Sequence, residues 1–144
     1  MVNIKVKKLV DNATLPVKAH DTDAGYDLTA ASVESDFLHN QIKVHTGIAI
    51  QPEPGYYCEI FPRSSVYKKQ LELANSVAII DSGYTGEIIL VFDNIGNTIL
   101  HSKIEKGERI AQLIVRKQED AVFEEVTVLD TTSRGEGGFG STGV

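Results

Sequence analysis

The stretch that decides the expected fold is QIKVHTGIAIQPEPGYYCEIFP, residues 41–62. Its apolar side chains Ile42, Val44 and Ile48 lie at even spacings, which is the period of a half-buried β-strand and not the 3.6-residue period of a helix. A turn signal at 52–55 and a second extended run at 56–61 follow. We therefore expect two β-strands here with a turn between them.

The same alternation continues on both sides of this stretch. Val2, Ile4 and Val6 alternate with polar residues near the N-terminus. Further strands are expected at 77–80, 87–92, 98–104, 109–116 and 122–129, with a hairpin signal at 81–86 and one short helix around 65–73. Many short strands without alternating helices predict an all-β chain, a distorted jelly roll or β-sandwich.

Composition limits the function classes. The chain has 144 residues, 42% of them hydrophobic, which suits one globular domain. Its formal charge of −6 argues against a duplex-DNA binder, because such a protein needs a basic face. No apolar run is long enough for a membrane span and none resembles a secretory leader, so we expect a cytoplasmic protein. The single cysteine, Cys58, excludes an intramolecular disulfide and a multi-thiolate zinc site, and we expect it to be an inert core thiol.

The C-terminal end has a composition of its own. Five of the twelve glycines fall in the last ten residues, so we expect a folded core over 1–129 and a flexible arm over 130–144. Arg134, the glycine N–H groups and the hydroxyls of Ser141 and Thr142 suit a polyphosphate, and the Phe139 ring suits stacking on a flat base. Composition alone favours the alternative, a disordered tail without a role.

Two further clusters have both a functional and a structural interpretation. Arg63, followed by two serines where a strand meets the expected helix, suits an anion, whereas Ser64 or Ser65 would also serve as a helix cap. Asp81 opens a turn, and a carboxylate there forms an Asx-turn more often than it acts in catalysis. Neither cluster decides the function by itself.

The remaining acidic clusters are equally open. Asp23 and Asp27 flank a glycine and suit either a hydrated Mg²⁺ or a solvated loop. Glu108 and Arg109 are interpreted as ordinary surface charges at the start of a strand. The four histidines show no metal-ligand spacing, and no catalytic triad is assigned from them.

Taken in chain order, five segments resemble the five motifs of the trimeric dUTPase family. They are PVKAHDTDAGYDL (16–28), PRSS (62–65), NSVAIIDSGYTGE (75–87), GERIAQL (107–113) and RGEGGFGSTG (134–143). The resemblance runs from about Lys5 to the C-terminus, and the last two segments are highly specific. It departs at Ala78, where glycine is usual, at Gly83, where an acid is frequent, and at residues 65–67, where Gly-Leu-Ala is common.

This resemblance implies a homotrimer of jelly-roll subunits whose three active sites are each built by all three chains. The implied reaction is the hydrolysis of dUTP to dUMP and diphosphate, with Mg²⁺ on the triphosphate. Such a reaction limits uracil in DNA and supplies dUMP for thymidylate synthesis. The arm of one chain would close over the site of a neighbour.

The resemblance also assigns roles to individual residues. Asp81 is expected to orient and deprotonate the attacking water and to touch the 3′-hydroxyl, with Arg63 and Gln112 as the other catalytic residues. Asp27 is expected to hold the metal through water. The expected substrate contacts are Arg63, Ser64, Ser65 and Gln112 at the phosphates; Asn75, Ile79 and Ile80 at the uracil edge; Tyr84 at the sugar; Arg134, Ser141 and Thr142 at the γ-phosphate; Phe139 over the uracil; and Gly140 as a further substrate contact.

Two alternatives stay open. A dCTP deaminase shares the Arg-Ser-Ser segment, but Val91 stands where that family carries its catalytic glutamate, which makes deamination the weaker interpretation. A regulatory protein that binds a protein partner in response to dUTP would use the same scaffold. Intact acid, phosphate and arm residues favour turnover and leave room for such a second role.

Overall fold

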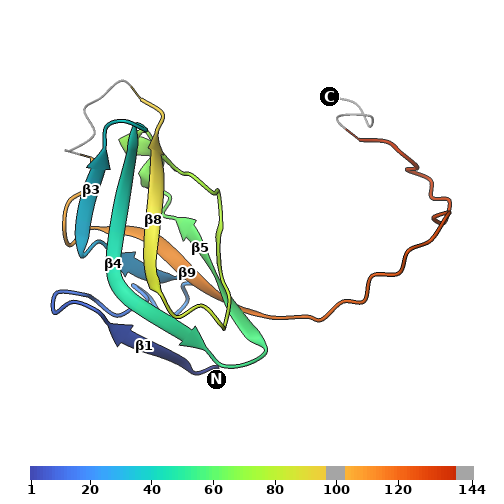
Figure 1. Cartoon of the computed structure of the whole chain (residues 1–144), viewed down its shortest axis with the longest axis horizontal. Coiled ribbons are helices and arrows are strands. Elements are labelled where there is room, and N and C mark those ends of the chain that lie inside the picture. The colour runs from blue at the N-terminus through green and yellow to red at the C-terminus, as the bar shows by residue number, and fades with distance from the viewer. Residues whose placement is uncertain (97–102, 139–144) are drawn as a thin grey trace.

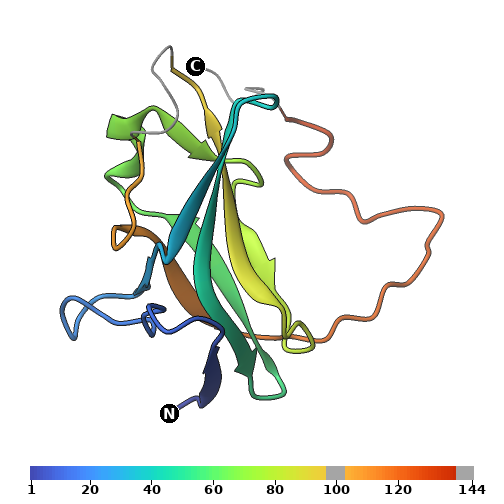
Figure 2. The ribbon, with the colours of Figure 1, turned by 60° about the vertical axis from the view of Figure 1, so that its left-hand side comes forward.

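The computed structural model describes residues 1–96 and 103–138, which form two antiparallel β-sheets packed face to face (Figures 1 and 2). Sheet A is made of β1 (Ile4–Lys8), β3 (Ser32–Asp36), β4 (Gln41–Pro52), β6 (Leu71–Leu73) and β8 (Glu87–Asn94). Sheet B has the order β2 (Tyr26–Thr29), β9 (Arg109–Lys117), β5 (Tyr56–Pro62) and β7 (Ala78–Ile80). The expected all-β sandwich is confirmed.

The long strand β4 organises sheet A. Its first half pairs with β3 and its second half with β1, while β8 runs along its other side. The pairing with β8 shifts at Gly47, which has φ +68° and whose backbone N–H donates to Glu87 Oε1 at 2.9 Å. A Cβ at Gly47 would lie 2.5 Å from Val10 Cγ2, so only glycine lets β4 bend there.

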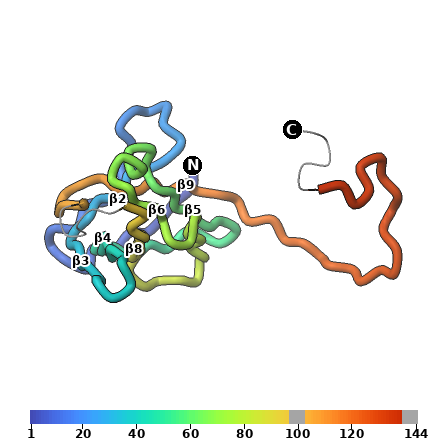
Figure 3. Tube along the Cα trace, turned by 90° about the horizontal axis from the view of Figure 1, so that it is seen from above, coloured from blue at the N-terminus to red at the C-terminus, as the bar shows by residue number. Residues whose placement is uncertain are grey.

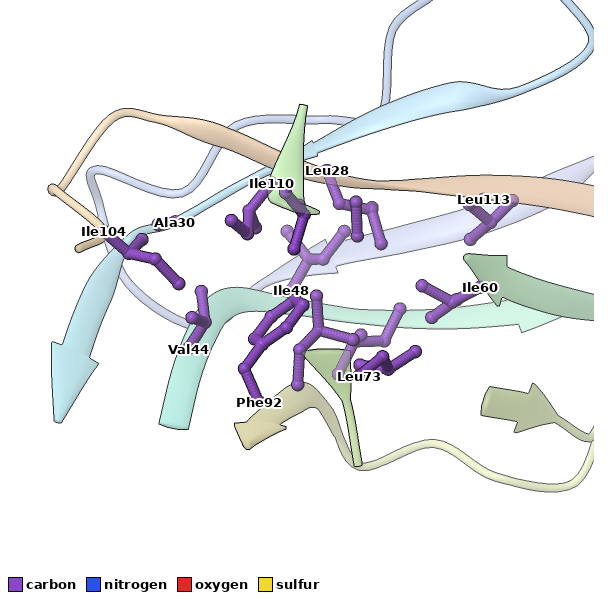
Figure 4. Close-up of a cluster of buried hydrophobic side chains, with 14 of the residues drawn as sticks. Leu28, Ala30, Val44, Ile48, Ile60, Leu73, Phe92, Ile104, Ile110 and Leu113 are labelled. Carbon is purple, nitrogen blue, oxygen red and sulfur yellow. The ribbon is translucent and has the colours of Figure 1, made fainter. Parts of the chain in front are cut away.

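The core lies between the two sheets (Figure 4). Ile42, Val44, Ile60 and Phe92 are fully buried, as the period-two pattern predicts for one face of each strand. Cys58 is also fully buried, and burial raises the pKa of its thiol to about 11, so that the reactive thiolate is scarce near neutral pH. The expectation of an inert core thiol is confirmed.

Most expected elements are present, with some corrections. The strands expected near the N-terminus and at 41–62, 77–80, 87–92 and 109–116 are confirmed as β1, β4, β5, β7, β8 and β9. The short helix is a single 3₁₀ turn, η1 (Val66–Lys69), which ends at Gln70 in the left-handed region with φ 52°. The hairpin at 81–86 is wrong, because β7 pairs in sheet B and β8 in sheet A, so this loop crosses between sheets.

The strand expected at 122–129 is wrong for this single chain. These residues form no strand, and Val122 and Phe123 are each 96% exposed. Their alternating pattern is typical of a strand, but no strand of the described chain pairs with them. Of the strand expected at 98–104, residues 98–102 lie outside the described residues, and the two that follow form a bend.

The segment after β9 leads away from the sandwich, as the orange-to-red trace in Figure 3 shows. It remains without regular secondary structure as far as residue 138. Within the ranges 1–96 and 103–138, no helix has the length and apolar character needed to cross a bilayer.

Candidate active site

Sheet B brings three of the expected site residues together on its outer face. Asp27 on β2 lies opposite Gln112 on β9, and Gln112 in turn lies opposite Phe61 near the end of β5. The neighbours of Gln112 in β9, Ala111 and Leu113, are buried in the core, so Gln112 points outward. Arg63 comes directly after β5.

Asp27 is the centre of this group. Its residue is 9% exposed, and its carboxylate is bound on both sides: Arg63 Nε lies 3.3 Å from Oδ1, and Arg109 Nη1 donates to Oδ2 at 3.0 Å. Burying a charged carboxylate is costly unless such partners compensate it. The alternative interpretation, in which Asp27 belongs to a solvated loop, is therefore wrong, because Asp27 lies in strand β2.

A pocket of about 230 Å³ opens beside this carboxylate. Its lining residues are Ala19, Asp23, Ala24, Gly25, Asp27, Arg63, Ser64 and Gln112. Gly25 packs directly on Gln112, since an added Cβ would lie 2.7 Å from Gln112 Oε1 and 3.0 Å from its Cβ. The absence of a side chain at Gly25 thus defines where the Gln112 amide can lie.

The two serines after Arg63 are exposed. Ser65 is the N-cap residue of η1, but its side chain makes no capping hydrogen bond, so the capping interpretation of Ser65 is not supported. Ser64 lines the pocket. Arg63, Ser64 and Gln112 together offer guanidinium, hydroxyl and amide donors to an anion.

Asp81 and Tyr84 form a second group at the opposite end of sheet B. Ile80 pairs with Cys58 in β5, so Asp81 follows at the level of Tyr57. Arg63, just past the end of β5, lies six residues beyond Tyr57, a separation of about 20 Å at 3.3 Å per residue. Within one chain, the two groups do not form one site.

The second group is a loop with an exposed carboxylate and a fixed ring. Asp81 is exposed, and its carbonyl accepts the Tyr84 N–H at 3.0 Å. The Tyr84 hydroxyl donates to the Glu87 carbonyl at 2.8 Å. Its ring lies over Gly86, where a Cβ would come within 2.6 Å of the hydroxyl oxygen. The ring is therefore held in one orientation and faces solvent.

The residues expected at the uracil edge flank the start of β7. Asn75 is exposed in the turn between β6 and β7, where Ser76 has φ 58°. Ile79 is 54% exposed on the outer face of sheet B, whereas the Ile80 side chain is buried. Ile80 can therefore offer a ligand only its backbone.

Of the expected arm residues, the structure describes Arg134. Arg134 is exposed, and its Nε donates to the Gly137 carbonyl at 2.9 Å within the arm. Figure 1 shows the described part of the arm extending away from the sheets. Phe139, Gly140, Ser141 and Thr142 lie outside the described residues.

Between the two groups, the outer face of sheet B carries an ion-pair cluster. Arg116 Nε donates to Glu59 Oε2 at 2.9 Å, and the Tyr57 hydroxyl donates to Glu59 Oε1 at 2.9 Å. The Arg116 hydrogen bond, followed by that of Tyr57, holds the pKa of Glu59 below its ordinary value. The same contacts raise the pKa of Tyr57 and of Arg116.

The donor set fits a metal that arrives with a phosphate ligand. Within residues 1–96 and 103–138, no group of three or more His, Cys, Asp or Glu side chains could cage a metal ion. A carboxylate offers about four acceptor positions, and two arginines leave capacity at Asp27 for a metal-bound water. Mg²⁺ keeps several waters when it is bound through phosphates, which suits an outer contact of this kind.

One contact of the site was missed in the sequence. Arg109 was interpreted as a surface charge, yet it contacts Asp27. The available signal was the break in alternation in β9, where Ile110 and Ala111 are adjacent and both buried. Glu108, also interpreted as a surface charge, pairs with Lys69 at 2.8 Å.

Comparison with known proteins gives a consistent result. The family model described as dUTPase matches residues 11–143. The chain is 42% identical over 149 residues to a deoxyuridine 5′-triphosphate nucleotidohydrolase of Rickettsia bellii, covering 100% of this chain and 97% of the relative. It is 37% identical over 145 residues to the protein of that name from Clostridium acetobutylicum, covering 100% and 99%. The structure of the Staphylococcus bacteriophage 80alpha dUTPase with dUPNHPP superposes with a TM-score of 0.83, at 30% identity and 99% coverage of both chains.

Proposed function

The chain belongs to the dUTPase family, and from this membership we propose that it hydrolyses dUTP to dUMP and diphosphate by attack of water on the α-phosphorus. The observation that carries the proposal is the convergence of Asp27, Arg63 and Gln112 on one pocket, bordered by the hydroxyl of Ser64. These groups match the needs of a triphosphate, which are cationic and neutral donors together with a carboxylate for a hydrated metal.

In this proposal the pocket binds the phosphates of the substrate. Arg63, Ser64, Ser65 and Gln112 bind and orient the triphosphate, and Asp27 holds a metal-bound water. A triphosphate brings about four negative charges to a protein of charge −6, so cations are needed to neutralise it. Mg²⁺, when bound to the triphosphate, would supply further neutralisation and stabilise the charge on the reacting phosphate oxygens.

In this proposal the Asp81 loop contacts the attacking water, the deoxyribose and the uracil base. The exposed Asp81 carboxylate orients the attacking water and accepts its proton, which then stays on the carboxyl group until product leaves. The fixed Tyr84 ring lies against the deoxyribose and leaves no room for a 2′-hydroxyl. Asn75 and the backbone at Ile79 and Ile80 read the uracil edge. Selection against UTP and dTTP is then steric.

We propose that these two halves meet between subunits of a homotrimer. The separation of about 20 Å within one chain prevents Asp81 from reaching a phosphate held at Arg63. Residues 122–129 carry strongly exposed apolar side chains, Val122, Phe123, Val128 and Leu129, which a second chain would cover.

The arm is the third contribution to each site. We propose a core over 1–129 and an arm over 130–144 that closes over a neighbour's site. Arg134, Ser141 and Thr142 would contact the γ-phosphate, and Phe139 and Gly140 would cover the uracil. Because the substrate belongs to the cytoplasmic nucleotide pool, we place the enzyme in the cytoplasm.

A substrate panel tests this function. Diphosphate release is measured with dUTP, UTP, dTTP and dCTP, each with and without Mg²⁺, and dCTP reactions are also analysed for dUTP and dUMP. We expect dUTP to be turned over much faster than the other three nucleotides, and we expect this turnover to depend on Mg²⁺. Equal rates with UTP, or deamination of dCTP, would contradict it.

A second candidate function is binding of a protein partner in response to dUTP. It is favoured by the likeness to the phage 80alpha dUTPase, which is described among phage dUTPases that control transfer of virulence genes by a G protein-like mechanism. The test is protein capture by the Asp81→Asn variant with and without dUpNHpp. A captured protein whose retention depends on the nucleotide supports this role, whereas nucleotide-independent capture or none contradicts it.

A further inference from the structure

The pairing of β2 with β9 contains an irregularity beside the pocket. Leu28 lies opposite Ala111, but the next residue, Thr29, lies opposite Arg109, so Ile110 is an extra residue on β9. Both Ala111 and Ile110 point into the core, at 0% and 1% exposure. This is a β-bulge. It reverses the inward and outward orientation of the β9 side chains beyond it, counted from Gln112 toward Arg109.

The bulge decides which face of the sheet carries Arg109. Strict alternation from the outward-facing Gln112 would turn Ile110 outward and Arg109 into the core. With one extra residue, Arg109 instead lies on the outer face, on the same side as Asp27 and Gln112. The chain thus keeps an irregular pairing whose result is a second guanidinium at the Asp27 carboxylate.

The two arginines use different oxygens of Asp27. Arg63 contacts Oδ1 through Nε at 3.3 Å, and Arg109 contacts Oδ2 through Nη1 at 3.0 Å. Arg63 follows the last residue of β5 and lines the pocket, whereas Arg109 is not among the residues that line it. Asp27 is thus held from the pocket side by one cation and from β9 by the other.

We propose that Arg109 is a positioning residue that fixes the Asp27 carboxylate through Oδ2, so that Arg63 can turn to the substrate phosphates without leaving Asp27 unpaired. This inference rests on the proposed dUTP hydrolysis. When a triphosphate enters, the Arg63 guanidinium is needed at the phosphate oxygens. Arg109 then remains as the counter-ion that holds Asp27 in the orientation required for a metal-bound water.

The test compares three variants of the full chain. Arg109→Gln removes the charge, and Arg109→Lys keeps it without the planar fork. Arg116→Gln is the matched control, because Arg116 lies on the same strand, is similarly exposed and pairs with Glu59 at 2.9 Å. For each variant we would measure kcat and KM for dUTP, the Mg²⁺ concentration for half-maximal rate, the melting temperature, and by calorimetry the binding of Mg²⁺ with the non-hydrolysed analogue dUpNHpp.

We expect kcat and Mg²⁺ binding to fall in the Arg109 variants and not in the Arg116 control. Arg109→Gln should lower kcat about 10- to 100-fold, the range typical of residues that orient a ligand-holding group, and should weaken Mg²⁺ binding in the dUpNHpp complex. Arg109→Lys should recover part of the loss, while Arg116→Gln should behave as the parent. If Arg109→Gln matches Arg116→Gln in every measurement, the inference is overturned.

A second background separates positioning from direct substrate contact. In the Asp27→Asn background, Arg109→Gln should cause no further loss of dUpNHpp and Mg²⁺ binding, because the group through which Arg109 acts is already changed. An additional, independent loss would show that Arg109 touches the substrate itself and would overturn the inference. If the parent chain does not turn over dUTP, the proposed function fails. If the parent chain is active and the Arg109 variants behave as the parent does, the proposed function stands and only the inference about Arg109 fails.

Discussion

The contact between Gly25 and Gln112 allows a substitution that disturbs the pocket by a single methyl group. In Gly25→Ala the new Cβ would lie 2.7 Å from Gln112 Oε1 and 3.0 Å from Gln112 Cβ. Carbon atoms in van der Waals contact are about 3.5–4.0 Å apart, so the Gln112 side chain must move by about 0.5–1 Å. The backbone of Gly25 lies outside the left-handed region, so alanine causes no strain of its own there.

The consequence for activity follows from this displacement. A misplacement of about 1 Å at a group that orients a substrate costs on the order of 100-fold in rate. We therefore expect kcat/KM for dUTP to fall about 10- to 100-fold in Gly25→Ala. The free energy of unfolding should fall by at most about 2–3 kcal/mol, because local crowding of about 1–3 kcal/mol is offset in part by about 0.4–1 kcal/mol from the stiffer unfolded chain.

The assay is continuous diphosphate release together with a thermal melt. Gly83→Ala serves as the control for melting, since no atom lies within 4 Å of a Cβ added at that position. A Gly25→Ala enzyme with kcat/KM within twofold of the parent would show that the position of the Gln112 amide does not control activity. A collapse of the melting temperature would also contradict the prediction, because the loss would then come from folding and not from Gln112.

Three other predictions concern the arm, the apolar segment after β9 and Glu59. Deletion of 134–144 should lower kcat/KM for dUTP by about 100-fold or more, while light scattering shows the oligomer retained, because so glycine-rich a segment has few apolar side chains to contribute to a core. Phe123→Asp should weaken subunit association by about 10- to 100-fold, seen as monomer in sizing chromatography, because burial of a phenylalanine is worth about 1.5–3 kcal/mol. The pKa of Glu59 is lowered from 4.5 by Arg116, so its contribution to stability is present above that pH and is lost as the pH falls through the lowered value. In Glu59→Gln the melting temperature should therefore fall less steeply with acidification below about pH 4.5 than in the parent.

The strands that could be predicted are those with a clear burial pattern. β4 and β5 carry alternating apolar residues because one face of each covers the core, and this pattern is visible without a partner. β2 and β3, with the sequences YDLT and SVESD, contain too many polar residues for such a pattern. Their strand structure comes from pairing with β9 and β4, which are distant in sequence.

The error at 122–129 has the same physical basis. Alternation predicts that a segment can form a strand, but a strand also needs a neighbour to satisfy its backbone hydrogen bonds. Among residues 1–96 and 103–138 of the same chain, no strand is such a neighbour. The alternating pattern therefore indicates a segment that would form a strand by pairing with another chain.

The candidate site residues were proposed from their motifs, but their arrangement in space could not be predicted. The convergence of Asp27, Arg63 and Gln112 depends on the strand order of sheet B, which the sequence does not state. The role of Arg109 depends on a bulge in the pairing of two strands, and its partner Asp27 lies 82 residues away in the chain. The separation of Asp81 from Arg63 likewise became visible only from the register of β7 against β5.

Mixing two inactive variants tests whether each site is completed by residues from different chains. Arg63→Gln and Asp81→Asn chains are denatured, combined in equal amounts, refolded together and assayed for diphosphate release from dUTP. If the two halves come from different subunits, random assembly gives about a quarter of the sites one intact copy of each half, and activity should return to about a quarter of the parent value. If each site lies within one chain, every site keeps one defect, and a mixture no more active than the two variants assayed separately would contradict the account.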